Sequence, residues 1–170
     1  MDFQTLAAAR YSVRRFDERP VAKEHIDLIL RAGQLAPTAC NKQPWHALVV
    51  ASEAGLEKLR MVTGSHFHCT AAIIVCQDNE ACWVREYDGH PAAEVDASIV
   101  ATHMMLQAAD IGVGSTWVMH FIPEACRVEF DIPAHLEPTA ILVLGYPAGD
   151  AQPAPAHAAT KDIAELTTWL

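Results

Sequence analysis

The sequence predicts a single α+β domain, and three observations support this prediction. Its 170 residues suit one core of ordinary size, whereas two halves would each bury too little apolar surface. Segments with apolar residues at helical spacing interleave with short, continuous apolar runs that are typical of buried strands. The connections between these segments do not resemble uniform βαβ units, so a regular parallel sheet is not expected.

The first half of the chain contains three predicted helices and two predicted strands. Ile26, Ile29 and Leu30 recur at helical spacing, and Pro37 ends that helix because the residue before a proline avoids helical geometry. Ser52 can cap the helix that follows the first strand. The predicted elements are a helix over 2–9 with Phe3 and Leu6 facing inward, a helix over 23–35, a strand over 45–51, a helix from Ser52 and a strand over 71–76.

The second half begins with an irregular segment, 79–91, that contains Trp83, Arg85, Tyr87 and Asp88 and is either a surface loop or part of a substrate pocket. The longest helix follows over 92–111, and its apolar residues surround it almost completely, which predicts burial on most sides. The remaining elements are a strand over 115–119, a helix over 123–130, a strand over 139–144, an extended Pro/Ala-rich stretch over 145–160, and a short strand or arm over 163–170.

The charge balance excludes one class of function. Twelve basic residues face 21 acidic ones, so binding of nucleic acid through a basic surface is not expected. The basic residues are nevertheless concentrated near the N-terminus, at Arg10, Arg14, Arg15 and Arg19. This concentration points to an anionic ligand.

Composition also bears on assembly and location. Hydrophobic residues make up 51% of the chain, which is high for a small monomer and favours an apolar subunit interface, most commonly that of a homodimer. The five cysteines are odd in number and form no CxxC pair. No leader segment and no membrane-spanning run is apparent, so we expect a cytoplasmic protein with reduced thiols and no membrane association.

The N-terminal segment Arg10-Tyr11-Ser12-Val13-Arg14-Arg15-Phe16 is the first candidate site. Two arginines four residues apart with a hydroxyl between them can surround a phosphate, because a guanidinium group binds phosphate through two parallel hydrogen bonds. The alternative is a solvated basic turn paired with Asp17 and Glu18. The spacing alone does not decide between them.

The loop Pro37-Thr38-Ala39-Cys40-Asn41-Lys42-Gln43-Pro44 is the second candidate. Two prolines stiffen it, and the Asn41 and Gln43 amides each offer both donors and acceptors. Such groups suit a heterocycle with alternating N–H and C=O groups, such as a flavin pyrimidine. The alternative is an ordinary connection between a helix and a strand.

Together these motifs resemble those of the flavin-dependent nitroreductase family. The resemblance continues in the same order along nearly the whole chain. It is carried by Arg10-x-Ser12-x-Arg14-x-Phe16, Ala36–Trp45, Asp96–Ile99 with His103–Ala109, Gly112–Val118, and Leu144–Ala148 with Pro153-x-Pro155-x-His157.

The resemblance implies an intertwined homodimer with FMN at the subunit interface. Each subunit would be one domain over 1–170, with a mainly antiparallel sheet of four to five strands flanked by helices. Residues 146–170 would form an arm that reaches the partner. Hydride would pass from NADH or NADPH through flavin N5 to a nitroaromatic, quinone or similar acceptor by a ping-pong scheme, without a catalytic side chain.

The resemblance also implies roles for individual residues. Arg10, Tyr11 and Ser12 would hold the flavin phosphate and ribityl chain, and Arg14 would lie near the pyrimidine edge. The other subunit would contribute Pro37, Thr38, Ala39, Asn41 and Gln43. The backbone of Trp117, Val118, Met119 and His120 would cover the ring near N5.

The arm departs from the family pattern. Relatives often have an arginine beside His157, whereas here Lys161 is the basic candidate for completing the phosphate site. Two other functions stay open: a specialised flavin reaction such as reductive dehalogenation or flavin remodelling, and a non-enzymatic metal or ligand module based on His66-Phe67-His68-Cys69. That cluster lacks the second ligand group that a tetrahedral site needs, so no metal is predicted.

Overall fold

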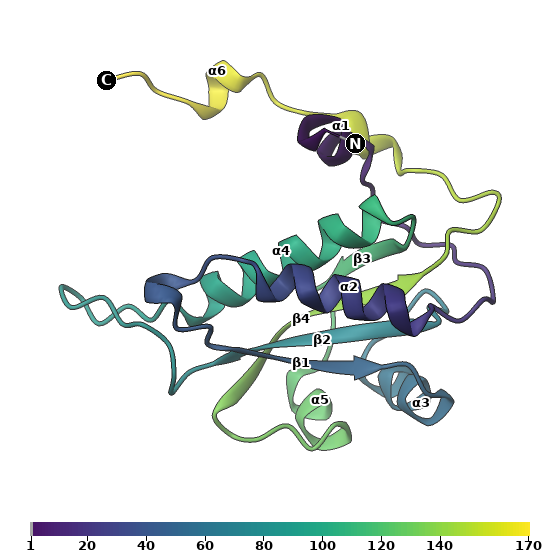
Figure 1. Ribbon diagram of the computed structural model, residues 1–170, viewed down its shortest axis with the longest axis horizontal. Helices are drawn as coiled ribbons and strands as arrows, with labels where there is room; N and C mark the ends of the chain where they lie inside the picture. The colour runs from purple at the N-terminus through teal and green to yellow at the C-terminus, as the bar shows by residue number, and fades with distance from the viewer. Residues whose placement is uncertain (1) are drawn as a thin grey trace.

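The computed structural model describes residues 2–170 and contains one four-stranded sheet with helices on both faces (Figure 1). The strand order is β1-β2-β4-β3, and every neighbouring pair is antiparallel. This confirms the predicted α+β fold with a mainly antiparallel sheet. The strands are β1 (Trp45–Val50), β2 (Ala71–Asp78), β3 (Gly114–Val118) and β4 (Leu136–Gly145).

Helices cover both faces of the sheet, as Figure 1 shows. Helices α2 (Lys23–Gln34) and α4 (Ala93–Asp110) pack on one face, and α3 (Glu53–Val62) and α5 (Pro123–Glu129) on the other. Successive side chains of a strand point to opposite faces, so the apolar run of β4 fills both cores. Leu142 and Leu144 pack toward α2 and α4, while Ile141 and Val143 pack toward α3 and α5.

The last strand is longer than the sequence indicates. β4 begins at Leu136 and runs through Pro138, a residue that cannot donate to a strand ladder. The pairing with β2 shifts between Val75 and Cys76, opposite this proline. This bulge lets the strand continue past the missing donor.

Helix α1 (Phe3–Ala9) has no buried residue, which corrects the inward placement of Phe3. Phe3 is 68% exposed, and Leu6 is half-buried. The helix lies outside the sheet, near the C-terminal end of α4, so it has no core face to bury within this chain (Figure 1).

The C-terminal segment runs past α1 and away from the body of the molecule (Figure 1). It contains the 3-10 turn η2 (Pro155–Ala158) and the short helix α6 (Ile163–Leu166). A strand at 163–170 is therefore wrong. Asp162 accounts for the helix, because its Oδ1 accepts from the Ala164 N–H at 2.9 Å and caps the first turn. Every residue from 158 to 170 is exposed, and Trp169 is 96% exposed.

Candidate functional site

The N-terminal motif is held against the edge strand β3. The Val13 N–H donates to the Ser115 carbonyl at 3.0 Å, and the Thr116 hydroxyl donates to the Val13 carbonyl at 2.6 Å. Ser12 and Ser115 form a parallel bridge. Both backbone groups of Val13 are therefore paired, and the motif forms a single bridge at the edge of the sheet beside β3.

The motif packs so closely against β3 and β4 that two positions on these strands have no room for a side chain. A Cβ added to Gly114 would lie 2.9 Å from Val13 Cγ2, and one added to Gly145 would lie 2.7 Å from Phe16 Cδ1. Glycine suits both positions because any Cβ there would force Val13 or Phe16 to move. Val13 faces the protein, and the alternation of an extended chain leaves Ser12 and Arg14 on the outer side.

Arg10, Tyr11, Ser12 and Arg14 line one cavity of about 300 Å³. The arm completes it, through Ala154, Ala156 and His157. His157 Nε2 lies 3.1 Å from the Ala8 carbonyl oxygen, which can only accept, so this nitrogen carries the proton. The imidazole ring also meets the Tyr11 ring edge-on, with centroids 6.2 Å apart.

The four arginines of this region fall into two groups, those with a carboxylate partner and those without one. Arg15 pairs with Asp150 at 2.7 Å, and Arg19 pairs with Asp17 at 2.6 Å. Within residues 2–170, neither Arg10 nor Arg14 has a carboxylate partner. Arg14 instead lies over the Phe67 ring, 5.9 Å from its centroid. The explanation as a solvated basic turn therefore fits Arg15 and Arg19, and the two motif arginines keep their charge available to an anion.

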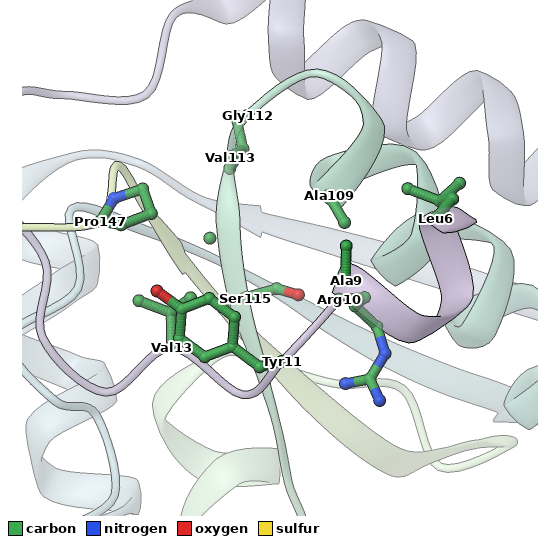
Figure 2. Close-up of a pocket in the computed structure, with 11 residues that line it drawn as sticks. Leu6, Ala9, Arg10, Tyr11, Val13, Ala109, Gly112, Val113, Ser115 and Pro147 are labelled. Atoms are coloured by element: carbon green, nitrogen blue, oxygen red, sulfur yellow. The ribbon is translucent and has the colours of Figure 1, made fainter. Parts of the chain in front are cut away.

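A smaller cavity of about 120 Å³ adjoins the motif on its other side. Figure 2 shows Leu6, Ala9, Ala109 and Val113 around it, with the Arg10 guanidinium extending away from Leu6 and Ala9. Its lining is mainly apolar, and it separates α1 from the turn between α4 and β3. Arg10, Tyr11 and Ser115 also border it, but its mainly apolar lining suits a phosphate less than the lining of the larger cavity does.

Lys161, the basic residue expected to complete the phosphate site, is exposed and does not line the cavity. His157 occupies that place. Sequence reasoning noticed His157 as part of the C-terminal signature but did not assign it to the site. The signal that could have found it is its place at the end of the Pro153-x-Pro155-x-His157 pattern.

The loop after Pro37 adopts an unusual backbone. Cys40, Asn41 and Gln43 all have positive φ, between 51° and 52°, a region that residues other than glycine rarely adopt. Local hydrogen bonds hold this shape, since the Gln43 N–H donates to Thr38 Oγ1 at 3.0 Å. The Asn41 and Gln43 side chains are exposed. Their hydrogen-bonding groups are thus presented outward from a constrained loop.

A buried carboxylate anchors the same loop. Asp96, in the first turn of α4, is 2% exposed, and its Oδ1 accepts from the Ala39 N–H at 2.9 Å. The other oxygen, Oδ2, is buried and lacks a hydrogen-bond partner among the described residues. Sequence reasoning did not assign Asp96 to the site, although an acidic residue between apolar neighbours on a helix expected to be buried on most sides was the available signal.

The two motifs lie at opposite ends of the sheet. Gly145 marks the motif end of β4, and Leu136 marks the other, where the Asp78 N–H donates to the Pro44 carbonyl at 2.8 Å. The ten residues of β4 span about 30 Å at the usual rise of a strand. One copy of the chain therefore does not bring the arginine motif and the Asn41–Gln43 loop together.

Residues 117–120 continue the edge strand that holds the motif. The Trp117 and Val118 side chains pack into the two cores, on opposite faces of the sheet. Met119 is 60% exposed, and the His120 carbonyl accepts from the Thr63 hydroxyl at 2.6 Å. Backbone at this edge thus lies in the same half of the molecule as Arg14.

The histidine–cysteine cluster does not assemble a metal site. Within residues 2–170, no three His, Cys, Asp or Glu side chains are close enough to hold an ion. His66 Nδ1 accepts from the His68 N–H at 3.0 Å, and burial, followed by the His68 and Arg60 charges, lowers the pKa of His66. None of the described helices is long and apolar enough to cross a membrane.

Comparison with known proteins supplies the family. The family model described as "Nitroreductase family" matches residues 7–68 and 62–146, which together make up most of the chain. The chain belongs to the nitroreductase family. This confirms the resemblance predicted from the arginine–serine motif and the Asn41–Gln43 loop.

Individual nitroreductase relatives extend the match. A crystal structure of a nitroreductase family protein from Clostridium difficile 630 superposes with a TM-score of 0.93 at 36% identity, over 99% of this chain and 98% of that one. A Methanothermobacter thermautotrophicus protein named "Putative NADH dehydrogenase/NAD(P)H nitroreductase" is 34% identical, over 87% of this chain and 78% of its own. A Thermus thermophilus protein named "NADH dehydrogenase" is 28% identical, over 90% of each chain.

Proposed function

We propose that this nitroreductase is an NAD(P)H-dependent oxidoreductase that binds FMN between two copies of the chain. The family and the names of its relatives support NAD(P)H-dependent oxidoreduction. The observation that carries the FMN proposal is the cavity lined by Arg10, Ser12, Arg14 and His157. The chain has a net charge of −9, yet Arg10 and Arg14 line this cavity without carboxylate partners among the described residues.

The cavity fits a phosphate ester in charge and donor type. Arg10 supplies a planar set of N–H donors, and Ser12 supplies a hydroxyl held in place by the bridge to Ser115. His157 can donate from Nδ1 when protonated, because Nε2 is already used on the Ala8 carbonyl. We assign the phosphate to these three residues. Lys161 would then act only at longer range.

Arg14 is placed for a different role. Its guanidinium lies over Phe67, farther along the edge strand toward Met119 and His120. We propose that Arg14 faces the pyrimidine edge of the ring system, where a fixed positive charge favours the anionic reduced form. Backbone groups of residues 117–120 would cover the central part of the ring.

The Asn41–Gln43 loop would come from a second copy. Since one chain holds the loop and the motif at opposite ends of its sheet, a two-fold dimer can place each loop beside the partner's motif. The apolar residues left exposed support such an interface. They include Phe3, Leu35, Val95, Ile163, Leu166 and Trp169. We propose that the arm over 146–170 wraps the partner and buries the last three.

FMN, when bound, accepts hydride from NADH or NADPH and passes electrons on to an electrophilic acceptor such as a nitroaromatic or a quinone. The protein needs no nucleophile of its own for this chemistry, and its buried thiols are unsuited to that role. Burial raises the pKa of Cys69 and Cys126 to about 11 and that of Cys76 to about 12. Donor and acceptor would use one pocket in turn.

The test is the visible absorption spectrum of the purified protein. We expect a flavin spectrum that bleaches when NADH or NADPH is added without oxygen and returns when a quinone or nitroaromatic is added. A colourless protein that takes up no FMN would refute the proposal. Bound FMN that bleaches without turning over these acceptors would favour a specialised reaction such as dehalogenation.

Arg10 and Arg15 provide a matched pair of variants for the phosphate site. Both are arginines of the same motif, but Arg10 lines the cavity and Arg15 pairs with Asp150 at the surface. Arg10→Ala should weaken FMN binding by roughly 10- to 100-fold, as expected for a charged hydrogen bond. Arg15→Ala should change it by less than about threefold. Equal losses, measured by flavin fluorescence titration, would show that the motif presents its other side to the cofactor.

A further inference from the structure

Asp96 is an unusual residue for the interior of this protein. It is 2% exposed in a helix that is otherwise mostly apolar, and within residues 2–170 only one of its carboxylate oxygens has a hydrogen-bond partner. A buried carboxylate oxygen without a hydrogen bond costs stability. An alanine or leucine here would avoid that cost, so the core alone does not explain the residue.

What Asp96 contacts points to its role. Its Oδ1 accepts from the Ala39 N–H, a backbone donor near the start of the loop that carries Asn41 and Gln43. The other end of the loop is fixed by Thr38 Oγ1, which accepts from the Gln43 N–H. Between these two bonds the chain passes through Cys40 and Asn41 with positive φ, a conformation that residues with side chains leave when nothing holds them.

The anchor is rigid because it belongs to α4, the longest helix, which packs against α2 and the sheet. Its charge also matters, since a carboxylate accepts a stronger hydrogen bond than a neutral oxygen does. The position in the first helical turn favours a negative charge there. The loop is therefore tied to a rigid part of the core through a carboxylate acceptor.

We propose that Asp96 is a positioning residue: through the Ala39 N–H it holds the 38–43 loop in the shape that presents Asn41 and Gln43 to the flavin of the partner subunit. This inference rests on the proposed FMN site. The stability lost by burying the unpartnered oxygen is then explained by the preorganisation of a binding loop. Asp96 itself touches neither flavin nor substrate.

The test compares Asp96→Ala and Asp96→Asn with the matched control Glu94→Gln. Glu94 is an exposed carboxylate of the same helical turn, so its replacement removes the same charge without touching the loop. The first readout is amide hydrogen exchange of Ala39 in FMN-free protein. Asp96→Ala should speed it by roughly 10- to 100-fold, Asp96→Asn by about threefold, and Glu94→Gln not at all.

The core supplies an internal standard for this measurement. Amides of β2 should keep their exchange rates in all three variants, because the effect is confined to the loop. If Asp96 served global stability alone, the exchange rates of the β2 amides would rise, or the exchange rate of Ala39 would stay unchanged. If Asp96→Ala does not fold, Asp96→Asn carries the test, since it retains an oxygen acceptor. Unchanged Ala39 exchange in the folded variants would overturn the proposal.

The second readout is FMN affinity by fluorescence titration of folded protein. We expect the loss of affinity to follow the same order, with Asp96→Ala at least tenfold weaker and Asp96→Asn within about threefold of wild type. Failure of the wild-type chain to bind FMN would refute the proposed function. FMN binding by wild type with unchanged affinity in Asp96→Ala would refute the positioning role alone.

Discussion

Replacing Gly114 by alanine tests whether close contact between β3 and the N-terminal motif positions the phosphate site. The added Cβ would lie 2.9 Å from Val13 Cγ2, 3.0 Å from its Cβ and 3.1 Å from its Cγ1. Ordinary carbon contacts are about 3.5–4.0 Å, so the whole valine must retreat by roughly half an ångström or more. Rotating the side chain gives no relief because Val13 Cβ is itself too close. The backbone must move, and two hydrogen bonds to residues 115 and 116 resist that movement.

Two opposing effects set the magnitude. Overpacking of this kind costs about 1–3 kcal/mol. Alanine also restricts the unfolded chain, which stabilises the protein by about 0.4–1 kcal/mol. The overpacking term is larger, and the free energy of unfolding should fall by about 1–2 kcal/mol. For a chain of this length that corresponds to a melting temperature lower by roughly 2–8 °C.

Gly149→Ala is the matched control, because a Cβ there meets nothing within 4 Å. Only the unfolded-chain effect remains, so its melting temperature should be unchanged or slightly higher. Thermal unfolding followed by circular dichroism on FMN-free protein, at one protein concentration, measures both variants. Displacement of Val13 also moves Ser12 and Arg14, so Gly114→Ala should bind FMN at least several-fold more weakly than Gly149→Ala. Equal melting temperatures and equal FMN affinities for the two variants would contradict the reasoning.

Further predictions concern the arm and the thiols. His157→Ala should weaken FMN binding more than Lys161→Ala, because only His157 lines the cavity; the reverse order in fluorescence titrations would restore Lys161 as the phosphate ligand. Cys40 is the exposed cysteine of the described chain, so a thiol reagent at pH 8 should modify one cysteine per native chain quickly and all five after denaturation. Burial raises the pKa of three thiols well above that pH, which leaves very little thiolate to react; fast reaction of more than one would show that the core opens readily. The three thiols with raised pKa are Cys69, Cys76 and Cys126.

Local signals made the element order and the outward-facing side of the motif predictable. Arg10, Ser12 and Arg14 alternate with Val13, and an extended chain places such residues on opposite faces. Helix α2 ends where Pro37 predicts, and Ser52 caps α3 by accepting from the Gly55 N–H at 3.2 Å. These features depend on neighbours in sequence, which is why a single chain reveals them.

Other features depend on contacts between distant segments. Asp96 and Ala39 are 57 residues apart, and nothing near either one in sequence indicates their hydrogen bond. The choice between His157 and Lys161 depends on where the proline-rich arm meets α1. The helix α6 was missed because its four residues are too few to show a periodic pattern. Pro138 hid the first part of β4, since the bulge that accommodates it is defined by the pairing with β2, a strand about sixty residues earlier in the chain.

The separation of the arginine motif and the Asn41–Gln43 loop by the length of β4 has a genetic consequence. In the proposed dimer, a chain with Arg10→Ala still carries an intact loop, and a chain with Asn41→Ala and Gln43→Ala still carries an intact motif. Co-assembly of the two defective chains would place both lesions in one site and none in the other. Random pairing of equal amounts would restore roughly a quarter of all sites. Two alleles that each fail alone would thus complement one another when their products form mixed dimers.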